Sequence, residues 1–249
     1  MPKLSVVIIT WNEEANIKRC LESVKWAAEI IIVDCGSTDK TLSLTQSYNN
    51  CRIINQAWLG FGKQKQFAVE QAANDWVLSL DADEELSTVL QKEIKNILQD
   101  PENFAYALFR RTFYLGKMIK HSGWQHDYPL RLFNKTKGNF NANIVHEYVI
   151  HNCPFRKLQA PLFHYPYPDL TAHLVKLQRY SSLGAFKLSE SCKQSDLAQA
   201  VARGIFKFLK MYFIRFGFLD GKEGFLLASL SAYGVFLKYV KLWEINRSK

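Results

Sequence analysis

The chain has 249 residues, of which 48% are hydrophobic and 14% aromatic, and this composition excludes an intrinsically disordered protein. The length fits one sizeable domain, with or without an appendage. The formal net charge of +9 favours an acidic partner, such as a nucleotide diphosphate, a phosphorylated lipid or an anionic membrane surface.

Strands and helices alternate through the first part of the chain. Four apolar, β-rich runs predict strands at 4–10, 30–34, 51–55 and 76–80. The segment after each run has helical spacing of apolar residues or a helix-capping residue, and helices are expected at 63–73 and 86–98 among others. This alternation predicts βαβ units and a mostly parallel, Rossmann-like α/β sheet flanked by helices.

The texture changes after Pro101. Runs at 105–114, 129–133 and 144–150 predict further strands separated by polar loops, and from Leu170 onward the pattern is helical. The run from Tyr165 to Asp169 contains two prolines and is the best boundary. We therefore expect a catalytic domain at 1–165, composed of halves at 1–100 and 101–165, and a helical extension at 166–249.

The fourth predicted strand ends in a group of carboxylates. Asp81 and Asp83 are two residues apart, so on extended backbone they share one side and one target. Ligands of open parallel sheets bind beyond the carboxyl ends of the strands, and paired carboxylates there suit Mg²⁺ or Mn²⁺. The alternative is a solvated turn that begins the next helix.

Three predicted strand ends carry polar signatures that would meet along one edge of the sheet. They are 10–14 (Thr-Trp-Asn-Glu-Glu), 34–39 (Asp-Cys-Gly-Ser-Thr-Asp) and 81–83 (Asp-Ala-Asp). As an ordered set, these segments resemble glycosyltransferase family 2, whose members have the GT-A fold. The resemblance covers roughly residues 4–100. It implies an enzyme that transfers a sugar from a nucleotide diphosphate sugar.

The resemblance also implies roles for individual positions. Nucleotide-sugar binding is expected at Thr10, Asn12, Glu13, Asp34, Ser37, Asp39, Lys65, Asp81 and Ala82. Asp83 would hold the metal at the diphosphate, with Asp81 facing the metal or the ribose. Many family members have a second Asp where this chain has Cys35, so base recognition is expected to differ. Lys65 is either a positive contact to the donor or a solvated lysine.

Family 2 enzymes invert the anomeric centre, which requires a carboxylate base for the acceptor hydroxyl. Two candidates follow, Glu147 and Asp127, and Glu147 is preferred because it ends an apolar segment beside a histidine. Asp127 stands four residues before Arg131, although the usual Glu-Asp pair reads His-Asp here. Either one is alternatively a surface carboxylate.

Two histidines, His146 and His164, are candidates to complete the metal shell, as a late histidine does in some GT-A enzymes. The alternative for each is a hydrogen-bonded histidine without a metal. The second histidine of a zinc-protease motif is absent after His146, since position 150 is Ile.

The last third of the chain predicts a membrane-associating extension. In 203–216, Arg203, Lys207 and Lys210 share one helical face, with Phe213 among the apolar residues opposite. The longest charge-free apolar run, 224–237, is too short to span a bilayer. The alternative is a helical pair that packs on the catalytic domain or forms a homo-oligomer. No nucleic-acid recognition motif accompanies the basic residues.

The pattern as a whole is similar to the bacterial lipopolysaccharide core glycosyltransferases of family 2. Further segments carry this similarity: 58–65, 123–124, 131–133, 145–147 and 219–225. It implies a hexose donor, glucose being one candidate, and a lipid-linked inner-core acceptor, with Trp124 and Arg131 as acceptor contacts. It also implies a cytoplasmic enzyme, peripheral on the inner face of the bacterial inner membrane, and the five separate cysteines fit a reducing compartment.

Two rival functions remain open on the sequence. One is a glycosyltransferase with a protein or polyprenyl-phosphate acceptor. The other is a non-catalytic nucleotide-sugar or membrane-binding protein, which would not need Asp81, Asp83 and Glu147.

Overall fold

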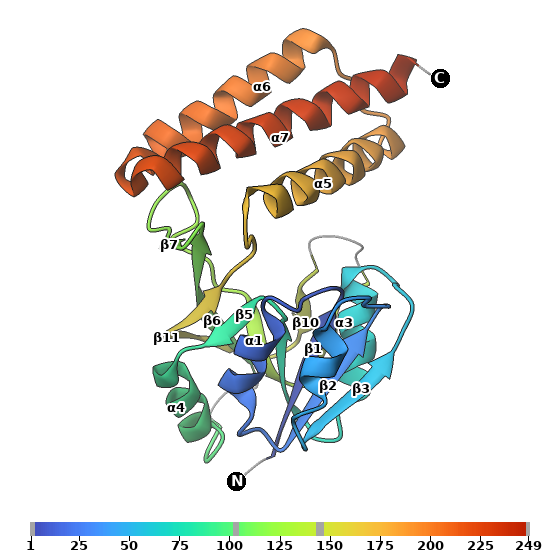
Figure 1. Ribbon diagram of the computed structural model, residues 1–249, viewed down its shortest axis with the longest axis vertical. Coiled ribbons are helices and arrows are strands. Elements are labelled where there is room, and N and C mark those ends of the chain that lie inside the picture. Colours follow the sequence, from blue (N-terminus) through green and yellow to red (C-terminus); the bar gives the residue numbers. More distant parts are fainter. Residues whose placement is uncertain (1–2, 102–104, 143–146, 248–249) are drawn as a thin grey trace. The chain divides into compact units, whose positions relative to one another are not determined.

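The computed structural model describes residues 3–101, 105–142 and 147–247, and these divide into two compact units (Figure 1). Unit 1 comprises the chain up to Arg111 together with His126–Tyr165. Unit 2 comprises Thr112–Gln125 and the chain from Pro166 on. One change of unit falls at the expected boundary after residue 165, and the hairpin 112–125 joins the C-terminal helices. The functional division into a catalytic domain and an extension stays a prediction.

Four parallel strands form one half of the sheet in unit 1, in the order β3-β2-β1-β4. Their bounds are β1 Leu4–Thr10, β2 Glu29–Asp34, β3 Cys51–Asn55 and β4 Trp76–Asp81. In the register, Thr10 pairs with Asp34 and Ile9 pairs with Asp81. The carboxyl ends of β1, β2 and β4 therefore align at one edge, as predicted.

The parallel strands are apolar on both faces because helices cover both. Val6 and Ile8 belong to one buried cluster with residues of α1 (Ile17–Val24), while Val7 belongs to another with residues of α3 (Phe61–Glu70). The remaining helices of this unit are α2 (Thr41–Thr45) and α4 (Thr88–Ile97).

The second half of the sheet is antiparallel and continues in the order β8-β6-β11-β5. The bounds are β5 Glu84–Leu86, β6 Ala105–Tyr114, β8 Leu130–Asn134 and β11 Phe155–His164. The short hairpins are formed by β7 (Lys117–Met118), β9 (Gly138–Phe140) and β10 (Val149–His151). Of the strand expected at 144–150, residues 149 and 150 belong to β10 and residues 147 and 148 are not strand, while 143–146 lie outside the described part of the chain.

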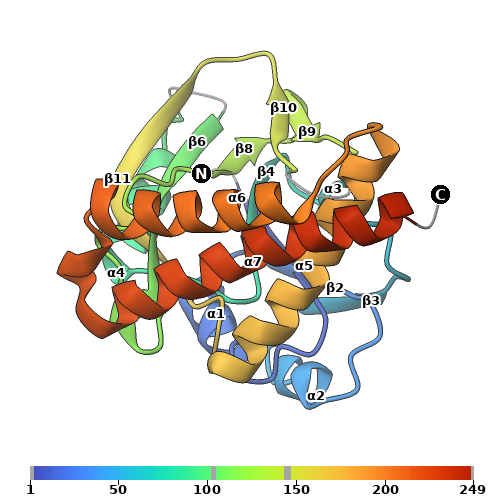
Figure 2. The ribbon, with the colours of Figure 1, turned by 90° about the horizontal axis from the view of Figure 1, so that it is seen from above.

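Three helices dominate unit 2, and α7 (Gly221–Arg247) packs between α5 (Leu170–Glu190) and α6 (Leu197–Leu209) (Figures 1 and 2). Asp169 and Asp196 cap α5 and α6 with their side chains. A Cβ on Gly204 would lie 3.2 Å from Cβ of Phe236, so glycine allows α6 and α7 to approach closely. α7 begins at Gly221, directly after a 3₁₀ turn that ends at Asp220.

By length and composition alone, the helical stretch Gly217–Arg247 could cross a membrane. From the sequence we expected no membrane-spanning helix, because only the charge-free run 224–237 was considered. A membrane-spanning helix tolerates a few charged residues, so the longer stretch qualifies. Lys238 and Lys241 lie within this stretch. Lys241 Nζ donates hydrogen bonds of 2.8 Å to the hydroxyls of Ser181 and Ser182 on α5.

Candidate active site

The loops after β1 and β2 interlock at the aligned sheet edge. Asn12, with a positive φ of 54°, accepts a hydrogen bond of 2.8 Å from Thr38 N through Oδ1. Its own N–H donates to Ser37 Oγ at 2.9 Å. Asparagine tolerates this left-handed conformation, which suits it to the turn that begins two residues after the end of β1.

Asp34 organises the turn that follows β2. Its Oδ1 accepts from Thr10 Oγ1 (2.9 Å) and Ser37 Oγ (2.5 Å), and its Oδ2 accepts from the N–H groups of Gly36 and Ser37, both at 2.8 Å. Burial would raise the pKa of Asp34, but these hydrogen bonds outweigh it and lower the pKa below its usual value. Both oxygens accept hydrogen bonds from the protein, so the side chain holds the loop after β2 in one conformation.

Asp39 and Glu13 are drawn together through Thr41. Asp39 Oδ1 accepts from Thr41 N (2.9 Å) and Thr41 Oγ1 (2.5 Å), and the same hydroxyl accepts from Glu13 N at 2.7 Å. Burial acts to raise the pKa of Asp39, and the hydrogen bonds from Thr41 and Glu14 lower it overall. The predicted residues of the first two strand ends are therefore assembled into one loop pair.

Asp81 lies between two buried cations. Its Oδ1 is 2.7 Å from Nζ of Lys65, and its Oδ2 pairs with Arg131. Lys65 on α3 is 2% exposed, which excludes the solvated-lysine alternative. Burial opposes ionisation of Asp81, but the charges of Arg131 and Lys65 hold its pKa well below the usual range.

Glu84 and Arg110 belong to the same network, and the sequence assigned neither a role. Glu84 is fully buried, and its Oε1 lies 2.7 Å from Nη2 of Arg131 and 3.1 Å from Nη1 of Arg110. Its Oε2 accepts from Asp81 N at 3.0 Å, which closes the turn after β4. The Asp-x-Asp-Glu run was a usable signal for Glu84, whereas nothing near Arg110 on β6 marked it.

The two candidate bases have different surroundings. Glu147 Oε1 lies 2.8 Å from Nζ of Lys65, so it shares that cation with Asp81. Asp127 accepts from Arg110 through Nε at 2.7 Å and through Nη2 at 2.5 Å. Glu147 is thus linked through Lys65 to the carboxylate at the end of β4, while two nitrogens of the Arg110 guanidinium bind Asp127.

Asp83 does not share a face with Asp81 in the way the sequence suggested. Residues 82 and 83 form a turn rather than extended backbone, so the alternation of strand side chains does not apply. Asp83 Oδ2 instead lies 3.5 Å from Nε2 of His164 on β11. In the described ranges, no three His, Cys, Asp or Glu side chains gather as a metal cluster. His146 lies outside those ranges.

Three further residues that the sequence predicted as ligand contacts, Ala82, Arg131 and Trp124, lie in different surroundings. Ala82 packs in the apolar core of unit 1, so only its backbone is available to a ligand. Arg131, expected at the acceptor, is 4% exposed and is held by Asp81 and Glu84. Trp124 lies in unit 2, edge-on to Tyr114.

Comparisons with known proteins agree with this architecture. The family model described as Glycosyl transferase family 2 matches residues 5–158. The chain is 32% identical to the lipopolysaccharide core biosynthesis glycosyltransferase LpsC of Rhizobium meliloti, covering 100% of this chain and 96% of LpsC. It is 34% identical to an uncharacterized glycosyltransferase of Rickettsia typhi, covering 99% and 88%.

A solved structure shares the fold. Staphylococcus aureus TarS, crystallised in complex with UDP-GlcNAc, superposes with a TM-score of 0.52 at 15% identity, covering 99% of this chain and 92% of that one. The sheet of unit 1, with its parallel half, antiparallel half and flanking helices, is the GT-A fold. The family match and the full-length relatives together show that this chain belongs to glycosyl transferase family 2.

Proposed function

We propose that this glycosyltransferase transfers a hexose from a nucleotide diphosphate sugar, with inversion and with the help of a divalent cation, to a lipopolysaccharide core acceptor. The observation that carries the proposal is the shared ammonium of Lys65. It joins Asp81 at the end of β4 to Glu147, which is far away in the sequence. This contact brings a candidate base to the sheet edge at which β2 ends and the loop containing Asp34 and Asp39 begins.

The donor set at Asp83 is compatible with Mg²⁺ or Mn²⁺. Cis ligands of an octahedral ion with bonds of about 2.1 Å lie about 3 Å apart, and Asp83 Oδ2 is 3.5 Å from His164 Nε2. One carboxylate suffices for such an ion, because substrate phosphates and water supply the other ligands. Asp81 is a weaker candidate ligand, since Lys65 and Arg131 already neutralise it. When bound, the cation would stabilise negative charge on the departing diphosphate.

The protein's own groups would carry the proton transfer. The Glu147 carboxylate accepts the proton of an acceptor hydroxyl, whose oxygen bonds to the anomeric carbon as the bond from that carbon to the diphosphate oxygen breaks. The leaving group takes the bonding electron pair, and attack from the opposite face inverts the configuration. Lys65 orients Glu147 through the 2.8 Å contact and adds positive charge beside the donor.

Replacing Asp83 tests this function. We expect Asp83→Ala to lower the Mn²⁺- or Mg²⁺-dependent release of nucleoside diphosphate by about 10²–10³-fold, because stabilisation of the leaving group is lost. The measurement is release from a panel of nucleotide sugars, with and without the metal. The matched control is Asp75→Ala. Asp75 is an exposed carboxylate directly before the start of β4, at the opposite end of the strand from Asp83. Absence of turnover by the wild type with every donor and acceptor would favour the non-catalytic binding protein.

The acceptor is proposed from the relationship to LpsC, a lipopolysaccharide core biosynthesis glycosyltransferase. The similarity covers nearly the whole length of both chains. A screen of purified, truncated core glycolipids alongside peptide and polyprenyl-phosphate acceptors decides between the alternatives. Transfer only to a peptide or a polyprenyl phosphate would contradict the core assignment while leaving the enzyme class intact.

Peripheral association with an anionic membrane completes the proposal. Arg203 on α6 and Lys210 directly after it are exposed on the basic side, and the apolar residues opposite are also exposed, among them Ile205 and Leu209. An apolar stripe beside a basic one is typical of a helix that lies in the membrane interface. The contacts of α7 with α5 and α6 are compatible with a helical bundle that lies on the membrane.

A further inference from the structure

A second apolar surface lies where α6 passes into α7, within unit 2. Residues 213–225, here named the aromatic corner, connect the two helices through the π-helical turn η1 (Lys210–Ile214) and the 3₁₀ turn η2 (Gly217–Asp220). Six large apolar side chains of the corner are exposed: Phe213 (53%), Ile214 (63%), Phe216 (55%), Phe218 (43%), Leu219 (59%) and Phe225 (48%). A soluble surface normally scatters such residues singly, so their concentration in one turn requires a reason.

The backbone of the corner turns tightly, with one bulky residue in a left-handed conformation and two glycines in close contact with other backbone atoms. Phe216 has a φ of 55°, a left-handed conformation that is rare for a bulky residue. A Cβ on Gly224 would lie 2.0 Å from Gly217 O, and one on Gly217 would lie 2.7 Å from Met211 O. The tight turn therefore depends on both glycines. Strain of this kind persists where the surrounding structure enforces it, and it is concentrated at functional segments.

The two carboxylates of the corner, Asp220 and Glu223, are bound by the segment 117–121. Asp220 is 2% exposed and accepts hydrogen bonds from the N–H groups of Lys120 (3.0 Å) and His121 (2.9 Å). Lys117 Nζ donates to Asp220 O at 2.6 Å and lies 3.1 Å from Glu223 Oε2. The segment 117–121 thus holds the turn from inside: backbone N–H groups bind the Asp220 carboxylate, and Lys117 pairs with Glu223.

The cations around the corner face outward. Lys210, Arg215 and Lys222 are exposed. Burial and the charges of Lys210, Lys238 and Arg215 lower the pKa of Lys207, so the local field is positive. An anionic partner would relieve this crowding of like charges, which is the charge complementarity expected of an acidic surface.

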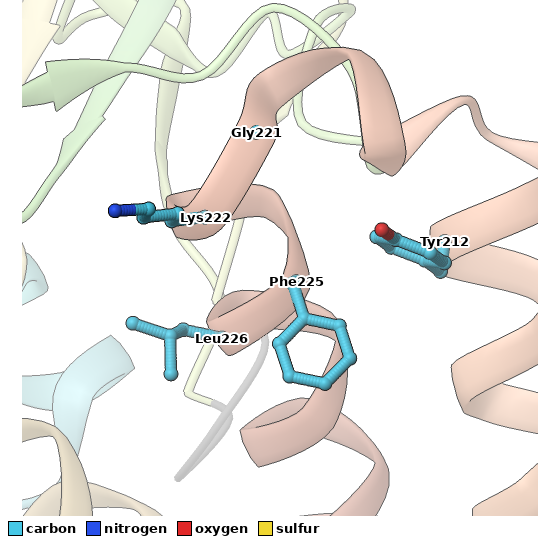
Figure 3. Close-up of a pocket in the computed structure, with 5 residues that line it drawn as sticks. All are labelled: Tyr212, Gly221, Lys222, Phe225 and Leu226. Carbon is cyan, nitrogen blue, oxygen red and sulfur yellow. The ribbon is translucent and has the colours of Figure 1, made fainter.

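A shallow pocket of about 510 Å³ opens in the corner, lined by Tyr212, Gly221, Lys222, Phe225 and Leu226 (Figure 3). The rings of Tyr212 and Phe225 lie 5.7 Å apart, nearly perpendicular to each other. Aromatic and aliphatic walls beside an ammonium combine the two chemistries of an anionic phospholipid, which has apolar chains and a phosphate.

We propose that the aromatic corner is the part of unit 2 that inserts into the headgroup region of an anionic phospholipid bilayer. This inference rests on the proposed peripheral function and adds its point of insertion. Aromatic and aliphatic side chains partition into the interface, and the flanking Lys and Arg side chains are attracted to anionic lipid. The α6 stripe then lies along the surface while the corner anchors one end of it.

Vesicle sedimentation tests the corner. The probe is the full chain with vesicles of pure phosphatidylcholine or of phosphatidylcholine containing phosphatidylglycerol. We expect Ile214→Ser/Leu219→Ser to weaken binding to the anionic vesicles by tenfold or more, because two of the most exposed apolar groups are lost. The matched control is Val175→Ser/Phe186→Ser, which removes side chains of 65% and 59% exposure from α5. The control is expected to bind like the wild type.

Three outcomes would overturn the inference. They are equal binding by the Ile214→Ser/Leu219→Ser variant and the wild type, an equal loss in the α5 control, and a change of the variant's oligomeric state in gel filtration without vesicles. The last would identify the corner as a contact between copies of the chain. Release of nucleoside diphosphate without vesicles is measured in parallel. A wild type that binds vesicles but releases none would refute the proposed enzyme activity and leave the insertion point standing.

Discussion

Glu147→Gln is expected to lower kcat by about 10²–10⁴-fold, the range that a general base contributes. The amide keeps the size of the side chain and its oxygen still accepts from Lys65, but it cannot take a proton from the acceptor hydroxyl. The measurement is steady-state transfer to a core glycolipid at saturating donor across a range of pH. Because only the proton acceptor is removed, the acceptor KM should change far less than kcat.

The competing base provides the control. Asp127→Asn breaks the ion pair with Arg110. The Asp127 side chain is 41% exposed, and ion pairs that are partly exposed contribute about 1 kcal/mol or less. We therefore expect its kcat to fall by no more than about fivefold, since 1.4 kcal/mol corresponds to a factor of ten. If Asp127→Asn is as damaging as predicted for Glu147→Gln while Glu147→Gln stays active, the assignment of the base reverses.

Lys65→Met is expected to reduce the free energy of unfolding by about 3–5 kcal/mol, because it removes the cation paired with Glu147 and leaves Asp81 to pair with Arg131. Lys65 is 2% exposed and contacts both Asp81 (2.7 Å) and Glu147 (2.8 Å). Methionine retains much of the stem, so the lost packing is small. The measurement is urea denaturation at neutral pH, where Asp81 is ionised in both the folded and the unfolded chain.

Two further variants separate this charge effect from a general loss of packing. Lys63→Met changes an exposed lysine on the same helix and should shift the free energy of unfolding by less than about 0.5 kcal/mol. In a double-mutant cycle, Lys65→Met should be less costly in a Glu147→Gln background, because one uncompensated charge has been removed. A Lys65→Met effect no larger than that of Lys63→Met would show that the buried pair does not support the fold.

The parallel half of the sheet could be predicted closely from the sequence. β1 and β3 have the predicted bounds, and β2 and β4 differ by one residue at one end. These strands are covered on both faces, so nearly every residue in them is apolar and local pattern is decisive. The antiparallel half was harder, because β5 has only three residues and the interior of β11 contains exposed polar positions. Their pairing depends on contacts distant in sequence.

The candidate site divides in the same way. The aligned strand ends were predictable because a parallel sheet places them together. The network of Lys65, Arg131, Arg110 and Glu84 was not, since its members come from different strands and a helix, and burial converts ordinary charged residues into partners. The same applies to the aromatic corner, because its π-helical segment has no signature in the sequence.

The most direct test of the central claim, that a cation and a nucleoside diphosphate meet at the turn after β4, is Mn²⁺ binding followed by electron paramagnetic resonance. Titrations use UDP, GDP or ADP with wild-type, Asp83→Ala and Asp75→Ala chains. We expect saturable Mn²⁺ binding that requires one of the nucleotides, and a decrease in affinity of at least about tenfold in Asp83→Ala alone. Undiminished, nucleotide-dependent Mn²⁺ binding by Asp83→Ala would contradict the claim.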